Sequence, residues 1–319
     1  MAIDRVLRDV KFLNGVGTLA GSLAVPAGAE ASPGVVMIGG SGPPDRNNDT
    51  YFPPLRRHFL DAGFAVLSYD KRGVGESSGD WREATIEDLA ADANVALDFI
   101  RSQPEVRADA VGLFGHSEGG WVALSAGTAR DDIPWVVTNS CPGTTPAIQE
   151  RHALANFLRT GRATQHDIGS TLLLYDRLAE AGRRDIDFIE ATRIVGSTGG
   201  PPGFAHYWAD MDERLWEFLK RKQDHDPMRD APLLRCPHLA IFGGADELVP
   251  VADSVRLFSA AACHPDRHRR ATLTVEVFPG ANHRVQTNGS PHFASGYLSS
   301  LIRWTEDRNA HRSQATGQR

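Results

Sequence analysis

The chain has 319 residues, enough for one large domain or two small ones with a substantial core. With 41% hydrophobic and 23% charged residues it has the composition of an ordinary soluble globular protein, and its net charge of −6 argues against a nucleic-acid partner, which usually carries a basic surplus. No apolar run approaches the ~20 residues that a membrane-spanning helix needs, so no membrane contact is expected.

The first residues and the cysteines predict a cytoplasmic protein. Residues 1–14 alternate charged and apolar side chains and lack the continuous apolar stretch of a signal peptide. Cys141, Cys236 and Cys263 cannot all pair within one chain, and they show no metal-ligand spacing. We therefore expect a reducing compartment, at least two buried free thiols and no bound metal.

The first half of the chain alternates apolar runs with helical patterns. Residues 6–13 and 18–25 alternate in polarity around Asn14-Gly15-Val16-Gly17, which predicts an antiparallel hairpin. In the segment 86–100, apolar residues recur at three- and four-residue steps, as in an amphipathic helix. The other elements expected in this half are strands at 34–38, 64–69 and 110–114 and a helix at 51–62.

The second half contains the same rhythm with one interruption. Further strands are expected at 135–138, 238–242 and 273–278. Continuous apolar runs between helical patterns indicate an α/β fold, with a mostly parallel sheet covered on both faces. Residues 145–228 instead show helical patterns separated by Gly and Pro, without a convincing strand. We therefore predict a core of residues 1–144 and 229–305, a helical cap at 145–228 over the carboxyl ends of the strands, and a flexible polar tail at 306–319.

One pentapeptide predicts a nucleophile. Gly115-His116-Ser117-Glu118-Gly119 fits G-x-S-x-G, with a buried strand before it and a small-residue helix after it, which is the context of a nucleophile elbow. The turn would present the Ser117 hydroxyl at the upper edge of the sheet and direct the Glu118 N–H towards a developing oxyanion. The alternative is a glycine-rich turn without catalysis. His116 is expected to pack beneath the elbow.

A serine nucleophile needs a base and an acid that orients it, and in this fold they follow in the order acid, then histidine. Asp246 comes just after the strand 238–242, where an acid would reach the catalytic edge of the sheet. Its alternative role is a turn or helix-capping aspartate, and Glu247 is a weaker competitor. His283 lies on the loop after the last strand, which is the place of the base.

The second oxyanion donor is expected from the loop after the strand 34–38. Gly39-Gly40-Ser41-Gly42-Pro43 lets the backbone approach a substrate carbonyl, with the Ser41 N–H as donor. A phosphate-binding loop is the rival interpretation of these glycines. It is disfavoured because no Gly-Lys-Ser/Thr follows and because Pro43-Pro44 would stop a helix from opening there.

Several motifs in order make the sequence similar to bacterial serine esterases of the α/β-hydrolase superfamily, in the branch related to prolyl-oligopeptidase-type domains. They cover most of the chain: Gly40–Arg46, Tyr69–Ser77, Gly115–Gly120, Tyr207–Leu219 with Asp226-Pro227, Gly243–Pro250 and Gly280–His283. The resemblance implies a Ser–Asp–His triad, no cofactor, a helical cap between the sixth and seventh strands, and hydrolysis of acyl esters. The chain departs from the family at Gly39, where such proteins usually carry the histidine of His-Gly-Ser-Gly.

Residues of two kinds are candidates for substrate contact. Arg46, or Arg72 in the charged run 70–72, would meet an anionic group, whereas the alternative is a structural ion pair or a solvated loop. Trp208 and Trp216 belong to an aromatic-rich stretch of the cap and would line an acyl or aromatic pocket, whereas the alternative is that they form the cap's own core.

The sequence therefore predicts a serine hydrolase of a small-molecule carboxylic ester that acts through an acyl-enzyme on Ser117. A peptidase or thioesterase would use the same triad, as would a biosynthetic lyase or cyclase. A non-catalytic ligand-binding protein on this fold is the more distant alternative. A hydrophobic cap would also support a homodimer.

Overall fold

The computed structural model describes residues 5–15, 17–28, 31–197, 202–287 and 289–316. Eight strands form one sheet in the order β1-β2-β4-β3-β5-β6-β7-β8. Their bounds are β1 Arg5–Leu13, β2 Thr18–Pro26, β3 Ser32–Ile38, β4 Ala65–Tyr69, β5 Val106–His116, β6 Val136–Asn139, β7 His238–Gly243 and β8 Leu273–Phe278.

Strand directions confirm the predicted α/β fold. β1 and β2 form the expected antiparallel hairpin, closing at the pair Leu13 and Thr18. β2 is also antiparallel to β4, and from β4 to β8 every neighbouring pair is parallel. Because the carboxyl ends of parallel strands share one edge, the loops after β3, β5, β7 and β8 meet there.

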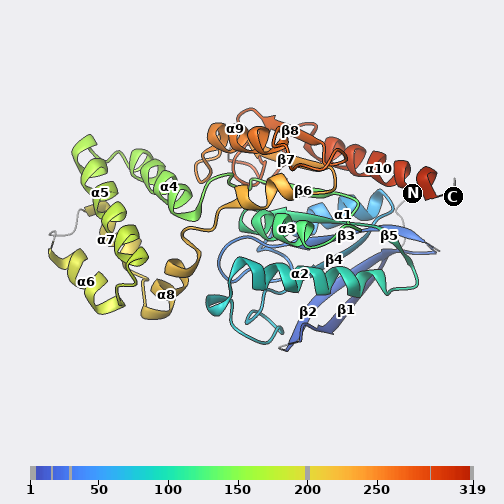
Figure 1. The fold of residues 1–319 in the computed structure, drawn as a ribbon, viewed down its shortest axis with the longest axis horizontal. Coiled ribbons are helices and arrows are strands. Elements are labelled where there is room, and N and C mark those ends of the chain that lie inside the picture. The colour runs from blue at the N-terminus through green and yellow to red at the C-terminus, as the bar shows by residue number, and fades with distance from the viewer. Residues whose placement is uncertain (1–4, 16, 29–30, 198–201, 288, 317–319) are drawn as a thin grey trace.

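Helices cover both faces of the sheet (Figure 1). α2, α3 and α9 pack on one face, and α1 and α10 on the other. The core helices are α1 Phe52–Asp61, α2 Ile86–Arg101, α3 Glu118–Thr128, α9 Val251–Ala262 and α10 Tyr297–Thr316, with short 3₁₀ turns at η1 Trp81–Glu83, η2 Pro227–Arg229 and η3 Ala231–Leu233.

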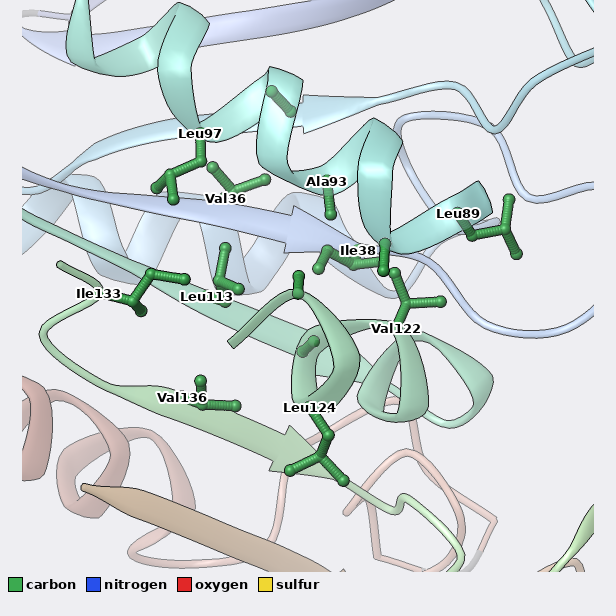
Figure 2. Packing of buried hydrophobic residues seen from close by; sticks show 14 of the residues in the cluster. Val36, Ile38, Leu89, Ala93, Leu97, Leu113, Val122, Leu124, Ile133 and Val136 are labelled. Carbon is green, nitrogen blue, oxygen red and sulfur yellow. The ribbon is translucent and has the colours of Figure 1, made fainter. Parts of the chain in front are cut away.

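Each central strand contributes to two cores because successive side chains point to opposite faces. Val36 and Ile38 of β3 pack in the core with α2 and α3, whereas Val35 and Met37 pack with α1 and α10. Figure 2 shows the first core, where Leu89, Ala93 and Leu97 of α2 lie over the strands. Burying a side chain of the size of Val or Leu contributes roughly 1.5–3 kcal/mol, so these layers stabilise the sheet on both faces.

Between β6 and β7 the chain forms a helical lobe beside the sheet (Figure 1). In the described part of 145–228 no residue belongs to a strand. The lobe has its own core, which includes Leu154, Leu158, Leu172 and Phe204. Its helices are α4 Pro146–Thr160, α5 Gln165–Arg183, α6 Phe188–Ser197, α7 Pro202–Trp208 and α8 Glu213–Lys222. The assignment of 145–228 as a cap domain stays a prediction.

The C-terminal segment differs from expectation. A flexible tail was predicted over 306–319, but α10 continues to Thr316, while 317–319 lie outside the described residues. The polar sequence hid this helix because its contact with the core is itself polar: Trp135 Nε1 donates to Asn309 Oδ1 at 3.1 Å. Within the described ranges, no helix combines the length and apolarity needed to cross a membrane.

Candidate active site

Ser117 lies in a strained turn between β5 and α3. Its φ of 56° and ψ of −122° fall outside the regions that non-glycine residues normally adopt, as at a nucleophile elbow. The flanking glycines are required by contact distance. A Cβ on Gly115 would lie 2.0 Å from the Gly119 carbonyl oxygen, and a Cβ on Gly119 would lie 2.3 Å from the Ile38 carbonyl oxygen. The local fold therefore matches the predicted strand–turn–helix context.

Asp246 and His283 come together across two loops. The Asp246 carboxylate is buried, and its Oδ2 lies 2.8 Å from His283 Nδ1. Its Oδ1 accepts hydrogen bonds from the N–H groups of Leu248 at 2.8 Å and Val249 at 3.1 Å. Asp246 thus makes the turn contacts of the alternative interpretation and also contacts the histidine. Since Nδ1 faces a carboxylate, Nε2 is the nitrogen left to act as a base.

The loop after β8 is shaped to present His283. Asn282 Oδ1 accepts hydrogen bonds from the N–H groups of Arg284 at 2.9 Å and Gln286 at 3.0 Å, which closes the turn around the histidine. The Ala245 N–H donates to the Ala281 carbonyl at 2.8 Å, so the acid loop and the histidine loop are joined by backbone.

Ser117 and His283 open into one cavity of about 560 Å³ at the carboxyl edge of the sheet. Among the described residues the Ser117 hydroxyl has no hydrogen-bond partner. Asp246 and His283 are therefore joined by a hydrogen bond, whereas His283 and Ser117 are not. Such bonds often tighten only when substrate is bound. The cavity is lined by Gly40, Ser41, Asn48, His116, Ser117, Ala245, Glu247, Leu248, Asn282, His283 and Arg284.

The backbone N–H groups of Ser41 and Glu118, the predicted oxyanion donors, lie on either side of the elbow, and Ser41 lines the cavity. The loop after β3 passes close to the serine, since a Cβ on Gly40 would lie 3.4 Å from Ser117 Cβ. Within the described chain, the N–H groups of Ser41 and Glu118 donate to no other protein group. Both are therefore available to a substrate oxygen, and Gly39 does not prevent the loop from reaching the serine.

Asn48 is a site residue that the sequence analysis missed. Its Nδ2 lies 3.0 Å from His116 Nδ1, and its Oδ1 accepts the Gly40 N–H at 3.3 Å. His116 is buried and packs 5.0 Å from the His283 ring, so it lies beneath the elbow as expected. Burial, followed by the electrostatic effect of the neighbouring His283, lowers the pKa of His116 well below 6.5. No local motif marks Asn48, because its partners are distant in sequence.

Arg46 is engaged in ion pairs. Its Nη2 lies 2.7 Å from Asp70 Oδ2 and its Nη1 2.8 Å from Asp9 Oδ1, and it does not line the Ser117 cavity. Burial acts to raise the pKa of Asp70, but the hydrogen bonds from Arg46 outweigh it and the pKa is lowered. Arg72 similarly pairs with Asp92 at 2.7 Å. This geometry favours the structural alternative over substrate contact.

Trp208 and Trp216 lie in the helical lobe. Trp216 is buried and donates through Nε1 to the Ile186 carbonyl at 2.8 Å, and Trp208 stacks on Phe188 at 6.0 Å. Both line an internal cavity of about 40 Å³, which shares no residue with the Ser117 cavity. A space of that size holds a few waters, so the geometry favours the core alternative, and their role in substrate binding stays a prediction.

In the described part of the chain, no three His, Cys, Asp or Glu side chains lie close enough together to hold a metal ion.

Comparisons with known proteins agree with the fold. The family model described as serine aminopeptidase, S33, matches residues 49–288. An uncharacterized 31.7 kDa protein of Escherichia coli is 24% identical over 217 residues, covering 66% of this chain and 72% of that protein. Esterase EstD of Thermotoga maritima is 24% identical over 245 residues, covering 75% of this chain and 52% of that protein. The structure of Pyrococcus furiosus esterase Pf2001 superposes with a TM-score of 0.59 at 18% identity, covering 95% and 92% of the two chains.

Proposed function

The chain belongs to the serine aminopeptidase S33 family and has the α/β-hydrolase fold, and from this premise we propose that it is a serine hydrolase that cleaves the carboxylic ester of a small molecule. One observation carries the proposal: His283, hydrogen-bonded to Asp246, lines the same cavity as Ser117 on its strained turn. That arrangement supplies a nucleophile, a base and an orienting acid within reach of one substrate.

In the first half of the reaction, Ser117 Oγ attacks the carbonyl carbon of the ester and its proton passes to His283 Nε2. Asp246 stabilises the imidazolium through Nδ1, where the two groups are already 2.8 Å apart. The carbonyl oxygen becomes an oxyanion that accepts hydrogen bonds from the N–H groups of Ser41 and Glu118. When the tetrahedral species collapses, the C–O bond to the alcohol breaks and the alcohol leaves with the proton from His283.

In the second half, water replaces the alcohol. His283 takes a proton from the water, whose oxygen attacks the acyl carbon bound to Ser117. Collapse of this second tetrahedral species breaks the bond to Ser117 Oγ, which recovers its proton from His283. The products are a carboxylic acid and an alcohol, and the protein returns to its starting state without a cofactor.

Ester hydrolysis is favoured over amide hydrolysis by the similarity to one relative that is an esterase, EstD of Thermotoga maritima. The description of the family, serine aminopeptidase, favours amide cleavage as the second candidate. The triad chemistry is common to both, so the leaving group must be settled by substrates. A place in the prolyl-oligopeptidase-related branch and a bacterial source stay predictions from the sequence.

The test compares p-nitrophenyl acetate, butyrate and octanoate with a p-nitroanilide and a thioester that share one acyl group. We expect ester release that depends on acyl length and falls by about a thousandfold or more in Ser117→Ala, with an unchanged circular-dichroism spectrum. Wild-type rates in folded Ser117→Ala would refute the nucleophile. Faster serine-dependent cleavage of the anilide would replace the esterase proposal with the peptidase.

A further inference from the structure

The carboxylate of Glu118 lies at the centre of a buried charge cluster next to the nucleophile. Its side chain is 1% exposed. Oε1 accepts from Lys71 Nζ at 2.7 Å, and Oε2 accepts from Lys222 Nζ at 2.9 Å and from Ser41 Oγ at 3.2 Å. Burial acts to raise the pKa of Glu118, but the two ammonium groups lower it to about 2, so this carboxylate is ionised at neutral pH.

The cluster holds the loop after β3 on the elbow. Lys71 Nζ donates to the Gly40 carbonyl at 2.7 Å while it also donates to Glu118. Ser41 is held directly through its hydroxyl. Gly39 and Gly40 have no side chains with which to fix this loop, so Lys71 and Glu118 constrain it together with Asn48, which accepts the Gly40 N–H. One expected oxyanion donor thus belongs to Glu118 itself, and the other belongs to Ser41, whose hydroxyl contacts the Glu118 carboxylate.

Lys222 brings the helical lobe into this arrangement. It is the last residue of α8, 104 positions from Glu118 in sequence, and its side chain is 7% exposed. Its ammonium group also lies 4.4 Å from the Phe218 ring centroid. The position of α8 therefore determines whether the second ammonium group reaches Glu118.

A role in stability alone is a weak account of these groups. Removing charges from water costs free energy that the mutual attraction repays only in part, and a well-packed apolar cluster would stabilise the fold at least as well. What apolar side chains cannot do is direct hydrogen bonds at the Gly40 carbonyl and the Ser41 hydroxyl. The cluster is thus suited to fixing the geometry of the loop.

We propose that Glu118 and Lys71 are positioning residues for the oxyanion loop, and that Lys222 makes this positioning depend on the seating of α8 against the core. The proposal rests on the proposed hydrolase function. None of the three side chains needs to touch substrate, because they act through the backbone N–H groups of Ser41 and Glu118. Their loss should weaken transition-state binding more than ground-state binding.

Lys222→Met is the direct test, because it keeps the Lys71–Glu118 pair and leaves no ammonium group unpaired. We expect kcat for p-nitrophenyl acetate to fall by about tenfold or more while KM changes by less than about twofold. The inhibition constant of phenylboronic acid, which forms a tetrahedral anion on the serine, should rise by a similar factor. A merely structural lysine would lower the melting temperature without changing this kcat-to-KM split.

Lys220→Met is the matched control. Lys220 lies on the same helix, its side chain is 8% exposed, and it pairs with Asp185 and Glu217 instead of Glu118. Its loss should leave kcat and boronate inhibition at wild-type values. Wild-type kcat in folded Lys222→Met, or an equal loss in both variants, would overturn the proposal.

Two further measurements test the proposal if Lys222→Met does not fold or if the wild-type protein does not hydrolyse esters. If Lys222→Met does not fold, Ser41→Ala removes only the hydroxyl contact with Glu118 and should show the same kcat-selective loss, whereas wild-type kcat there would overturn the proposal. A fluorophosphonate probe separates this proposal from the proposed function. Wild-type protein that neither hydrolyses esters nor is labelled on Ser117 would refute the hydrolase itself, and the positioning proposal with it.

Discussion

Asp246 uses its two carboxylate oxygens for two different tasks. Oδ1 accepts hydrogen bonds from the N–H groups that close the turn after β7. These bonds fix the position of the carboxylate independently of its contact with His283. Oδ2 is then free to accept a hydrogen bond from Nδ1 of His283. An aspartate whose position is set by backbone in this way can hold the imidazole in one tautomer through the whole reaction.

Asp246→Asn should lower kcat for ester hydrolysis by about a thousandfold or more with little change in KM. The asparagine amide keeps the shape of the turn, but it can donate to Nδ1 and so place the ring proton on Nε2, where the base must be unprotonated. The measurement is steady-state kinetics on p-nitrophenyl acetate, with circular dichroism as the check on folding.

Glu247→Gln is the control for this prediction. Glu247 lines the same cavity, but in the described structure its carboxylate makes no hydrogen bond to His283. Its change should leave kcat within about twofold of wild type. If Glu247→Gln lost activity and Asp246→Asn kept it, Glu247 would be the acid.

The sequence identifies residues whose role follows from their place after a strand. It misses residues whose role follows from a contact with a residue distant in the chain. Ser117, Asp246 and His283 each follow an apolar run, and the structure gathers them at one edge. Asn48 and Lys222 act through partners 68 and 104 positions away. No spacing rule connects such pairs, so only the folded chain shows them.

The elbow is the element whose geometry tolerates least change. Backbone from three segments converges around it: the end of β3, the start of α3 and Asn139 at the end of β6, whose carbonyl accepts the Ser117 N–H at 2.9 Å. A side chain at Gly119 would collide with backbone, which cannot move aside as a flexible side chain can.

Gly119→Ala should therefore reduce both stability and activity. The added methyl group would push α3 away from β3, and we expect a loss of roughly 1–3 kcal/mol in unfolding free energy, as for overpacked cores. Because the same shift separates Ser117 from the loop that carries Ser41, kcat should also fall. Urea unfolding and ester kinetics on the same preparation would measure both effects.

Gly169→Ala supplies the contrast within a helix. Gly169 is an exposed residue of α5, and a Cβ there would meet nothing within 4 Å. Alanine in a helix interior is favoured over glycine by up to about 1 kcal/mol, so this variant should gain stability and keep its activity. Equal behaviour of the two alanine variants would contradict the steric argument for the elbow.

Elements were predicted well where one physical signal dominated. The parallel strands β3, β4, β6 and β7 are apolar runs buried on both faces, and the hairpin has alternating polarity, so the sequence predicts both. β5 begins at Val106, earlier than the predicted 110, because its first residues include exposed ones outside the apolar run. The sequence predicts a flexible tail at 306–319 instead of the last turns of α10 because those turns lack an apolar stripe.

At the scale of the whole molecule, the helical lobe contacts the loops that carry the site. Gln149 Nε2 donates to the Leu248 carbonyl at 3.0 Å, and Asn156 Nδ2 donates to the Glu247 carbonyl at 2.8 Å, so α4 is joined to the acid loop. Lys222 joins α8 to the elbow. The sequence shows that 145–228 is helical and interrupts the sheet, but its docking depends on these long-range polar contacts, which leave no periodic signal.

The sheet interior also holds an ionisable group that links the stability of the whole fold to pH. His238 on β7 is fully buried, with Nε2 2.8 Å from Thr138 Oγ1, and its ring packs 5.3 Å from that of Phe258. Burial, followed by the positive charge of Arg267, lowers the pKa of His238 from 6.5 to about 3. Between these values the unfolded chain binds a proton that the folded chain does not, so stability is lost as the pH falls through this window.

His238→Gln should therefore weaken the acid sensitivity of folding. Glutamine does not titrate and can still bond to Thr138, so the unfolding free energy of the variant should fall less steeply from about pH 6.5 to about pH 4.5, by up to about 1.4 kcal/mol per pH unit. Urea midpoints across this range would measure the two slopes, with the exposed His264→Gln variant expected to follow wild type. Part of the slope should remain in His238→Gln, since the buried His116 acts with the same sign. A slope equal to wild type in His238→Gln would mean that the folded protein accommodates a proton on this ring, against the burial seen between β7 and α9.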